Sequence, residues 1–167
     1  DALVLRTNFF GWGNSVRTSF SDWILQSLAQ GRELTMFNDV FFTPMLISDL
    51  VDLILRLVER GATGVFNVAG GTRLSKYDFA LRLAGAFSYP TDGIRSIGVA
   101  EFPFTAQRPM DMSLSSDKAQ CYLDVQMPGV EEGLRRLADL KRQGRQQALQ
   151  EAMHVRLPAS GVPGTEA

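Results

Sequence analysis

The sequence is poor in the residues that build disulfides, metal sites and nucleophilic triads. Its 167 residues include one cysteine, Cys121, and one histidine, His154. A lone cysteine cannot form an internal disulfide and is most often a small buried hydrophobe. His154 precedes a tail rich in proline and glycine, and no Cys/His cluster has metal-ligand spacing. We therefore expect no metal site and no Ser-His-Asp or Cys-His catalysis.

Long apolar runs and an excess of one charge are also missing. No apolar stretch reaches 18 residues, and no basic segment followed by an apolar core opens the chain. We therefore expect no membrane span, no signal peptide and a cytoplasmic location. The net charge of -1 leaves no basic footprint for a nucleic-acid partner. A hydrophobic content of 45% argues against disorder over most of the chain, whose length suits one domain.

Two motifs of dinucleotide-dependent redox chemistry are absent. The segment 11–16 begins like G-x-G-x-x-G, but Val16 stands where the third glycine should allow helix and strand to pack closely. A catalytic tyrosine with a lysine four residues later is not found either, because Leu81, Gly93 and Gln126 occupy those places. We therefore assign no catalytic residue to this chain and interpret residues 8–18 as a plain loop.

The hydrophobic pattern predicts strands that alternate with helices. Strands are expected at 2–6, 33–37, 64–69 and 94–99, and helices at 19–30, 48–60, 75–87, 116–123 and 130–142. Residues 40–47 should be extended around a proline, and 100–116 irregular. This alternation predicts an α/β fold with parallel pairing. Residues 2–6 are typical of a strand buried on both faces, so a neighbouring N-terminal half is expected outside the chain.

Two of the helices have clear start signals and apolar stripes. Ser48 is the expected cap of the second helix, and Ser75 with Asp78 forms an acidic variant of a capping box before the third. The predicted stripes are Leu50, Leu53, Ile54, Leu57 and Val58 in the second helix, and Tyr77, Ala80, Leu81, Ala84 and Phe87 in the third.

Polar and aromatic residues gather in loops that follow strands, where ligands bind in open α/β sheets. These loops span residues 6–10, 38–44 and 107–111. In the last, the guanidinium of Arg108 suits a diphosphate, and in the first Phe9 offers a flat face to a sugar or base. Taken alone, Arg108 is more typical of a solvated surface arginine, and Phe9, Phe41 and Phe42 are more typical of core residues.

Four ordered blocks carry a resemblance to a known family. They are Leu5–Gly11, Asn38–Pro44 with Asp49-Leu50, Gly64–Val68 with Ser75–Ala80, and Arg108–Asp111 with Leu114 and Lys118. Together they resemble the C-terminal half of extended short-chain dehydrogenases/reductases, with dTDP-4-dehydrorhamnose reductases the nearest subgroup and sugar-nucleotide epimerases and dehydratases further off.

The resemblance implies a fold and a set of residue roles. The fold would be α/β, the C-terminal part of a Rossmann-like parallel sheet plus a small mixed substrate-binding subdomain, incomplete at the N-terminus. Residues 1–145 would form this half, and 146–167 a helix end and disordered tail. In an intact enzyme Thr7 would lie near the nicotinamide. The implied substrate-binding residues are Asn8, Phe9, Phe41, Phe42, Thr43, Arg108, which would hold the diphosphate, and Asp111, which would support its loop.

The implied function is the sugar-nucleotide-binding part of a reductase that acts on a dTDP-keto-deoxysugar. NAD or NADP would serve the intact enzyme, with no cofactor expected for this chain alone. The implied partners are a nucleotide-sugar substrate, the N-terminal dinucleotide-binding half and a second copy in a homodimer. Two alternatives remain open: a non-catalytic module like the regulatory subunit of methionine adenosyltransferase, and a truncated fragment that dissolves poorly because its sheet edge and apolar face are exposed.

Overall fold

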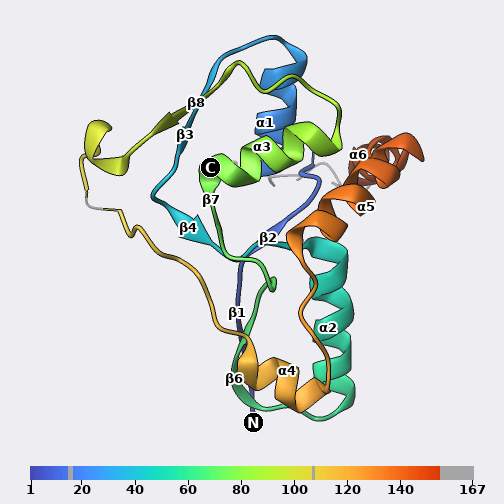
Figure 1. The fold of residues 1–167 in the computed structure, drawn as a ribbon. Helices are drawn as coiled ribbons and strands as arrows, with labels where there is room; N and C mark the ends of the chain where they lie inside the picture. The colour runs from blue at the N-terminus through green and yellow to red at the C-terminus, as the bar shows by residue number, and fades with distance from the viewer. Residues whose placement is uncertain (15–16, 107, 155–167) are drawn as a thin grey trace, which may run out of the picture.

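A computed structural model describes residues 1–14, 17–106 and 108–154, with side chains described up to Leu149. Its strands pair two by two, β1 with β6, β2 with β5, β3 with β8 and β4 with β7 (Figure 1). The first three pairs are parallel and the last is antiparallel. This confirms a mixed α/β fold with parallel strands.

The parallel pair β1–β6 forms one layer of the fold. Strand β1 (Leu3–Thr7) runs beside β6 (Gly64–Val68), with Thr7 opposite Val68. Helices α2 (Ile47–Glu59) and α4 (Asp117–Leu123) supply apolar side chains to the same cluster as this pair. Phe66 and Leu57 are almost fully buried in it. The predicted strands at 2–6 and 64–69 are therefore confirmed.

The opposite face of β1–β6 is open in the described part of the chain. Val4 is 49% and Val65 45% exposed, because the helices that pack on this pair, α2 and α4, cover its other face. The expected burial of β1 on both faces is therefore wrong for this chain by itself. The sequence nevertheless has the apolar residues that such burial would need.

A second layer is built on β3 (Leu34–Phe37) and β8 (Ile94–Ile97). Helices α1 (Phe20–Ala29), α3 (Lys76–Ala86) and α5 (Val130–Arg142) contribute to its core. Ser19 and Ser75 cap α1 and α3 by accepting the backbone N–H of Asp22 and Asp78. Such caps contribute roughly 1 kcal/mol each. The predicted cap at Ser75 is confirmed.

Short strands join the two layers. They are β2 (Phe9–Phe10), β4 (Phe41–Phe42), β5 (Met45–Leu46) and β7 (Leu74–Ser75). The sequence pattern predicted 40–47 as extended but placed β2 in a loop. A single-turn 3₁₀ helix, η1 (Val99–Glu101), lies in the segment expected to be irregular, and α6 (Arg145–His154) follows α5.

Helix α2 does not begin as predicted. It starts at Ile47 with Leu46 at the cap position and without a side-chain cap, so Ser48 lies inside its first turn. The reason is that β5 leads directly into the helix at Leu46. Val58 is 60% exposed rather than on the inner stripe, because the buried face of α2 runs through Leu50, Leu53 and Leu57.

The buried face of α3 is shifted from the predicted one. It consists of Phe79, Ala80, Leu83 and Ala84. Tyr77, Leu81 and Phe87 flank it and are only partly buried. Cys121 is exposed, against the expectation of a buried thiol. It lies on the outer side of α4, whose inner side is occupied by Ala119 and Leu123. No helix in the described ranges is long and apolar enough to cross a membrane.

Candidate functional site

Asn8 and Thr43 meet at the carboxyl end of β1. The Asn8 side-chain amide donates to the Met112 carbonyl at 2.9 Å and approaches the Thr43 hydroxyl at 3.5 Å. That hydroxyl accepts the backbone N–H of Leu114 at 3.1 Å. Two predicted site residues that are far apart in sequence thus hold the same stretch of chain, 112–114. Thr43 is buried, and Asn8 is half-buried.

Phe41 and Asp111 are brought together by backbone and side-chain contacts. The Phe41 N–H donates to Met110 at 2.8 Å, and its carbonyl accepts from Met112 at 2.9 Å, so Asp111 lies beside Phe41 in a parallel bridge. The Arg73 guanidinium covers the Phe41 ring at 3.9 Å and pairs with the Asp111 carboxylate at 2.8 Å. This arrangement attaches the segment 110–114 to β4.

The charge of Asp111 is stabilised by its neighbours. Hydrogen bonding by Ser113 and Arg73 lowers the pKa of Asp111 to about 2. The carboxylate therefore stays ionised throughout the neutral range. Support of its own loop stays the role that the family resemblance predicts for Asp111.

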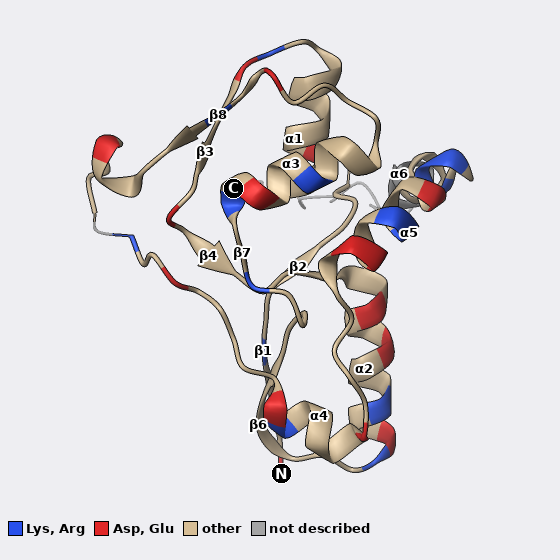
Figure 2. Cartoon of the chain, in the orientation of Figure 1, with Lys and Arg blue, Asp and Glu red and all other residues tan. Residues whose placement is uncertain are grey.

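Phe42 lies under a lysine. It is 4% exposed, and the Lys76 Nζ is 3.3 Å from its ring centroid and 4.8 Å from that of Phe20. Burial lowers the pKa of Lys76 to about 8. Figure 2 shows basic residues at the start of α3 and in the connection before β7.

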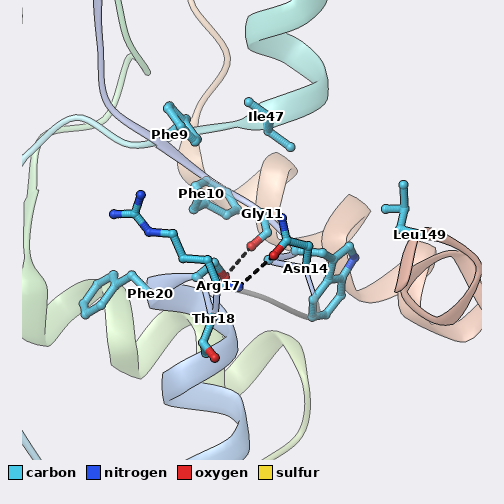
Figure 3. A pocket seen from close by; sticks show the side chains of 12 residues that line it. Phe9, Phe10, Gly11, Asn14, Arg17, Thr18, Phe20, Ile47 and Leu149 are labelled. Atoms are coloured by element: carbon cyan, nitrogen blue, oxygen red, sulfur yellow. Dashed lines mark hydrogen bonds between the residues drawn. The ribbon is translucent and has the colours of Figure 1, made fainter. Parts of the chain in front are cut away.

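A pocket of about 500 Å³ adjoins this region (Figure 3). Its walls are formed by β2, the following loop and the start of α1, with Ile47 and Leu149 opposite; its lining includes Phe9, Arg17 and Phe20. Phe9 is 58% exposed, so its ring is available to a ligand. No feature of the sequence predicted a pocket at this place.

The glycine-containing loop at 11–14 does not offer its amides to a phosphate. The Gly11 N–H donates to the Ser21 hydroxyl and the Gly13 N–H to the Asp22 carboxylate. A Cβ at Gly13 would come within 2.4 Å of the Arg17 carbonyl, so glycine is required by close packing. The contacts agree with the interpretation of a plain loop.

Thr7 and Arg108 differ in how they are placed. The Thr7 hydroxyl is buried and has no hydrogen-bond partner among the described residues. Such an atom is unfavourable unless a partner is supplied. Arg108 is exposed, with its guanidinium 5.3 Å from the Phe104 ring. No described contact joins Arg108 to the cluster of Asn8 and Thr43.

Arg73 and Lys76 were missed as site residues. Lys76 carried a usable signal, because a cation in the first turn of a helix opposes the helix dipole and needs a local reason. Arg73 gave none, since its value depends on a ring and a carboxylate that only the fold brings near. Among the described residues no group of three or more His, Cys, Asp or Glu is placed to hold a metal.

The layers of helices and parallel strands, with a polar cluster at the carboxyl end of β1, define part of a Rossmann-like reductase fold. Residues 1–142 match the RmlD substrate binding domain, and the chain belongs to this family. A curated relative is the probable low-salt glycan biosynthesis reductase Agl14 of Haloferax volcanii. It is 28% identical over 138 residues, which cover 80% of this chain and 46% of the relative.

Solved structures of dTDP-4-dehydrorhamnose reductases share the fold. The enzyme from Bacillus anthracis, solved in complex with NADP, has a TM-score of 0.72 at 23% identity. The match covers 81% of this chain and 47% of the Bacillus chain. An orthologue from Clostridium acetobutylicum has a TM-score of 0.73 at 22% identity, with 84% and 49% covered. The chain thus spans about half the length of the relatives that it matches.

Proposed function

We propose that this chain is the sugar-nucleotide-binding portion of an NAD(P)-dependent reductase that acts on a dTDP-keto-deoxysugar. The observation that carries the proposal is the convergence of Asn8 and Thr43 on the segment 112–114 at the carboxyl end of β1. Ligands of open α/β folds bind at this end of the strands. Asn8 and Phe9 would face the sugar, and Phe41, Phe42 and Thr43 would line its cleft.

The nucleotide would be held by the opposite side of the same cluster. Arg108 would pair with the diphosphate, since a guanidinium can bind two phosphate oxygens at once. Asp111 and Arg73 would keep the segment that carries Arg108 against β4. The support for this assignment is that the Asp111 carboxylate is ionised and accepts hydrogen bonds from both Arg73 and Ser113.

The cofactor would meet the chain at Thr7. Its buried, unpartnered hydroxyl suits a polar group supplied from outside the described residues, such as the nicotinamide carboxamide. NAD or NADP would supply the hydride, and Thr7 would orient the ring. The proton-transferring Tyr and Lys would belong to a dinucleotide-binding half, consistent with the absence of their spacing from this sequence.

The same half would cover the open faces of the structure. The exposed apolar residues Val4 and Val65 lie on β1 and β6, and Val51, Leu55 and Val58 lie on α2. A surface of this kind is typical of a buried interface rather than of a solvated face. The relatives, about twice as long as the matched segment, have the length to supply such a covering.

Titration of dTDP-rhamnose into the full natural protein tests the proposal. We expect binding, and at least about a tenfold loss of affinity for Asn8→Ala, the size expected for loss of one hydrogen-bonding side chain from a ligand site. Asn38→Ala is a matched control, because its amide donates to Ser96 at the β3–β8 pair. No binding by the natural protein would refute the proposal. Binding without oxidation of NADPH by dTDP-4-dehydrorhamnose would favour a non-catalytic module.

A further inference from the structure

Lys76 has an unusual position for a lysine. It is the first residue of α3, where the helix dipole disfavours a cation. Its backbone N–H donates to the Val40 carbonyl at 3.0 Å, which fixes the residue beside β4. Its ammonium group then lies on the face of Phe42, at 3.3 Å from the ring centroid.

The ammonium group is partly shielded from water, because Lys76 is half-buried and its nitrogen lies over two rings, and it gains no counter-ion from the described residues. Within the described residues no carboxylate lies within 4.0 Å of its nitrogen. The acidic side chains on the adjoining helices have other partners: Asp78 accepts from Ser75, and Asp22 accepts from Ser19 and Gly13. Aromatic faces compensate a buried cation only in part. An anion at this point would restore the lost solvation.

Two partly exposed aromatic rings, those of Phe20 and Trp23, form a stack whose Phe20 ring lies next to the Lys76 ammonium group. Phe20 and Trp23 stack at 6.1 Å between centroids and are 36% and 42% exposed. Phe20 also borders the pocket (Figure 3). Its ring centroid lies 4.8 Å from the Lys76 nitrogen. A cation beside flat apolar faces is the combination that a nucleotide requires, with phosphate on the cation and base or sugar on the rings.

We propose that Lys76 binds a phosphate of the nucleoside diphosphate part of the substrate, at the edge of the pocket formed by Phe20. This inference rests on the proposed function and adds to it a contact that none of the four sequence blocks marks as functional. The occupant is dTDP rather than the phosphates of NADP, because Lys76 directly follows β7, whose partner strand β4 consists of Phe41 and Phe42.

Calorimetric titration of the full natural protein with dTDP, thymidine and NADP tests the assignment. Lys76→Gln should weaken dTDP binding at least about tenfold, as expected for loss of a charged hydrogen bond. Thymidine and NADP affinities should change less than about twofold. Lys76→Arg should retain dTDP binding, and its melting temperature should match that of the natural protein.

Lys141→Gln is the matched control. Lys141 also lies over a ring, that of Phe87, but it belongs to the last turn of α5 and does not line the pocket. Unchanged dTDP affinity in Lys76→Gln, or a loss confined to NADP, would overturn the inference while the proposed function stands. Failure of the natural protein to bind either dTDP or dTDP-rhamnose would remove the proposed function and this assignment with it. Equal losses in Lys76→Gln and Lys76→Arg would also overturn it, because charge would then not be the cause.

Discussion

At the scale of single residues, the two polar groups with shifted pKa values have opposite environments. Asp111 is exposed and surrounded by donors, so its charge is favoured, whereas Lys76 is desolvated over rings, so its charge is disfavoured. Of these two groups, only Lys76 has a pKa close enough to neutral pH for its charge to change in the range where proteins are usually studied. A ligand that depends on the charge of Lys76 must therefore bind in a pH-dependent way.

We expect dTDP affinity to fall as pH rises past about 8, the pKa of Lys76. Below that value the ammonium is charged and attracts phosphate; above it the amine is neutral and the attraction is lost. The phosphates of dTDP are already fully ionised there, because their last pKa is near 6. Titrations at pH 7, 8 and 9 measure the effect.

The matched variant for this pH series is Lys76→Arg. Arginine stays charged over the whole range, so its dTDP affinity should remain flat. A parallel decline in both proteins would assign the pH dependence to another group.

A second prediction at this scale concerns Asp111→Asn. Loss of its ion pair with Arg73 should release the segment that carries Arg108, and so weaken dTDP-rhamnose binding several-fold. The melting temperature should change little, because exposed pairs contribute little to stability. Asp139→Asn removes a comparable exposed pair with Arg142 on α5 and should leave binding unchanged. A large loss of stability in Asp111→Asn with unaltered affinity would contradict this role.

At the scale of elements, close backbone packing joins the two layers. A Cβ at Gly70 would be 2.2 Å from the Pro44 carbonyl oxygen, so the turn after β6 touches the turn before β5. We expect Gly70→Ala to destabilise the protein by about 1–3 kcal/mol, as overpacking does. Thermal unfolding measures it.

Gly85→Ala is the control for Gly70→Ala. Gly85 lies in α3 with open space around its Cα. Alanine there should stabilise the helix by about 0.5–1 kcal/mol. Equal effects of both substitutions would show that the backbone at Pro44 moves away and accommodates the added methyl group.

The elements were the most predictable part of this molecule. Ser19 and Ser75 cap their helices because capping is a local interaction that the chain encodes within three residues. Ser48 failed as a cap because β5, a strand stabilised by its distant partner β2, runs directly into α2. Pairing between strands that are distant in sequence cannot be predicted from the residues around either strand.

The candidate site was only partly predictable for the same reason. The loops carrying Asn8, Phe41 and Thr43 were found because ligands lie beyond strand ends, and the fold does bring Asn8 and Thr43 together. Lys76 and Arg73 were not found, since their chemistry depends on rings and a carboxylate brought by other elements.

At the scale of the whole molecule, the open faces are the strongest feature. Strand β1 has one described partner, and the exposed side of β1–β6 is lined by Val4 and Val65. If a second copy of the chain covered this surface, the homodimer expected from the family would form there. If the dinucleotide-binding half covers it, the sheet continues through β1 within one molecule, as parallel sheets do when helices cover both faces.

A single substitution distinguishes a covered face from a solvated one. Val65→Lys in the full natural protein should lower the free energy of unfolding by about 1–3 kcal/mol if the face is buried, because an unpaired charge would enter an apolar layer. On a solvated face the change should stay within about 0.5 kcal/mol. Thr35→Lys is the control, since Thr35 is an exposed strand residue on β3, far from this face.

Denaturation at several protein concentrations then shows whether the face is covered by the same molecule or by a second copy. A midpoint that is independent of concentration indicates the molecule's own second half, whereas a midpoint that rises with concentration indicates a second copy.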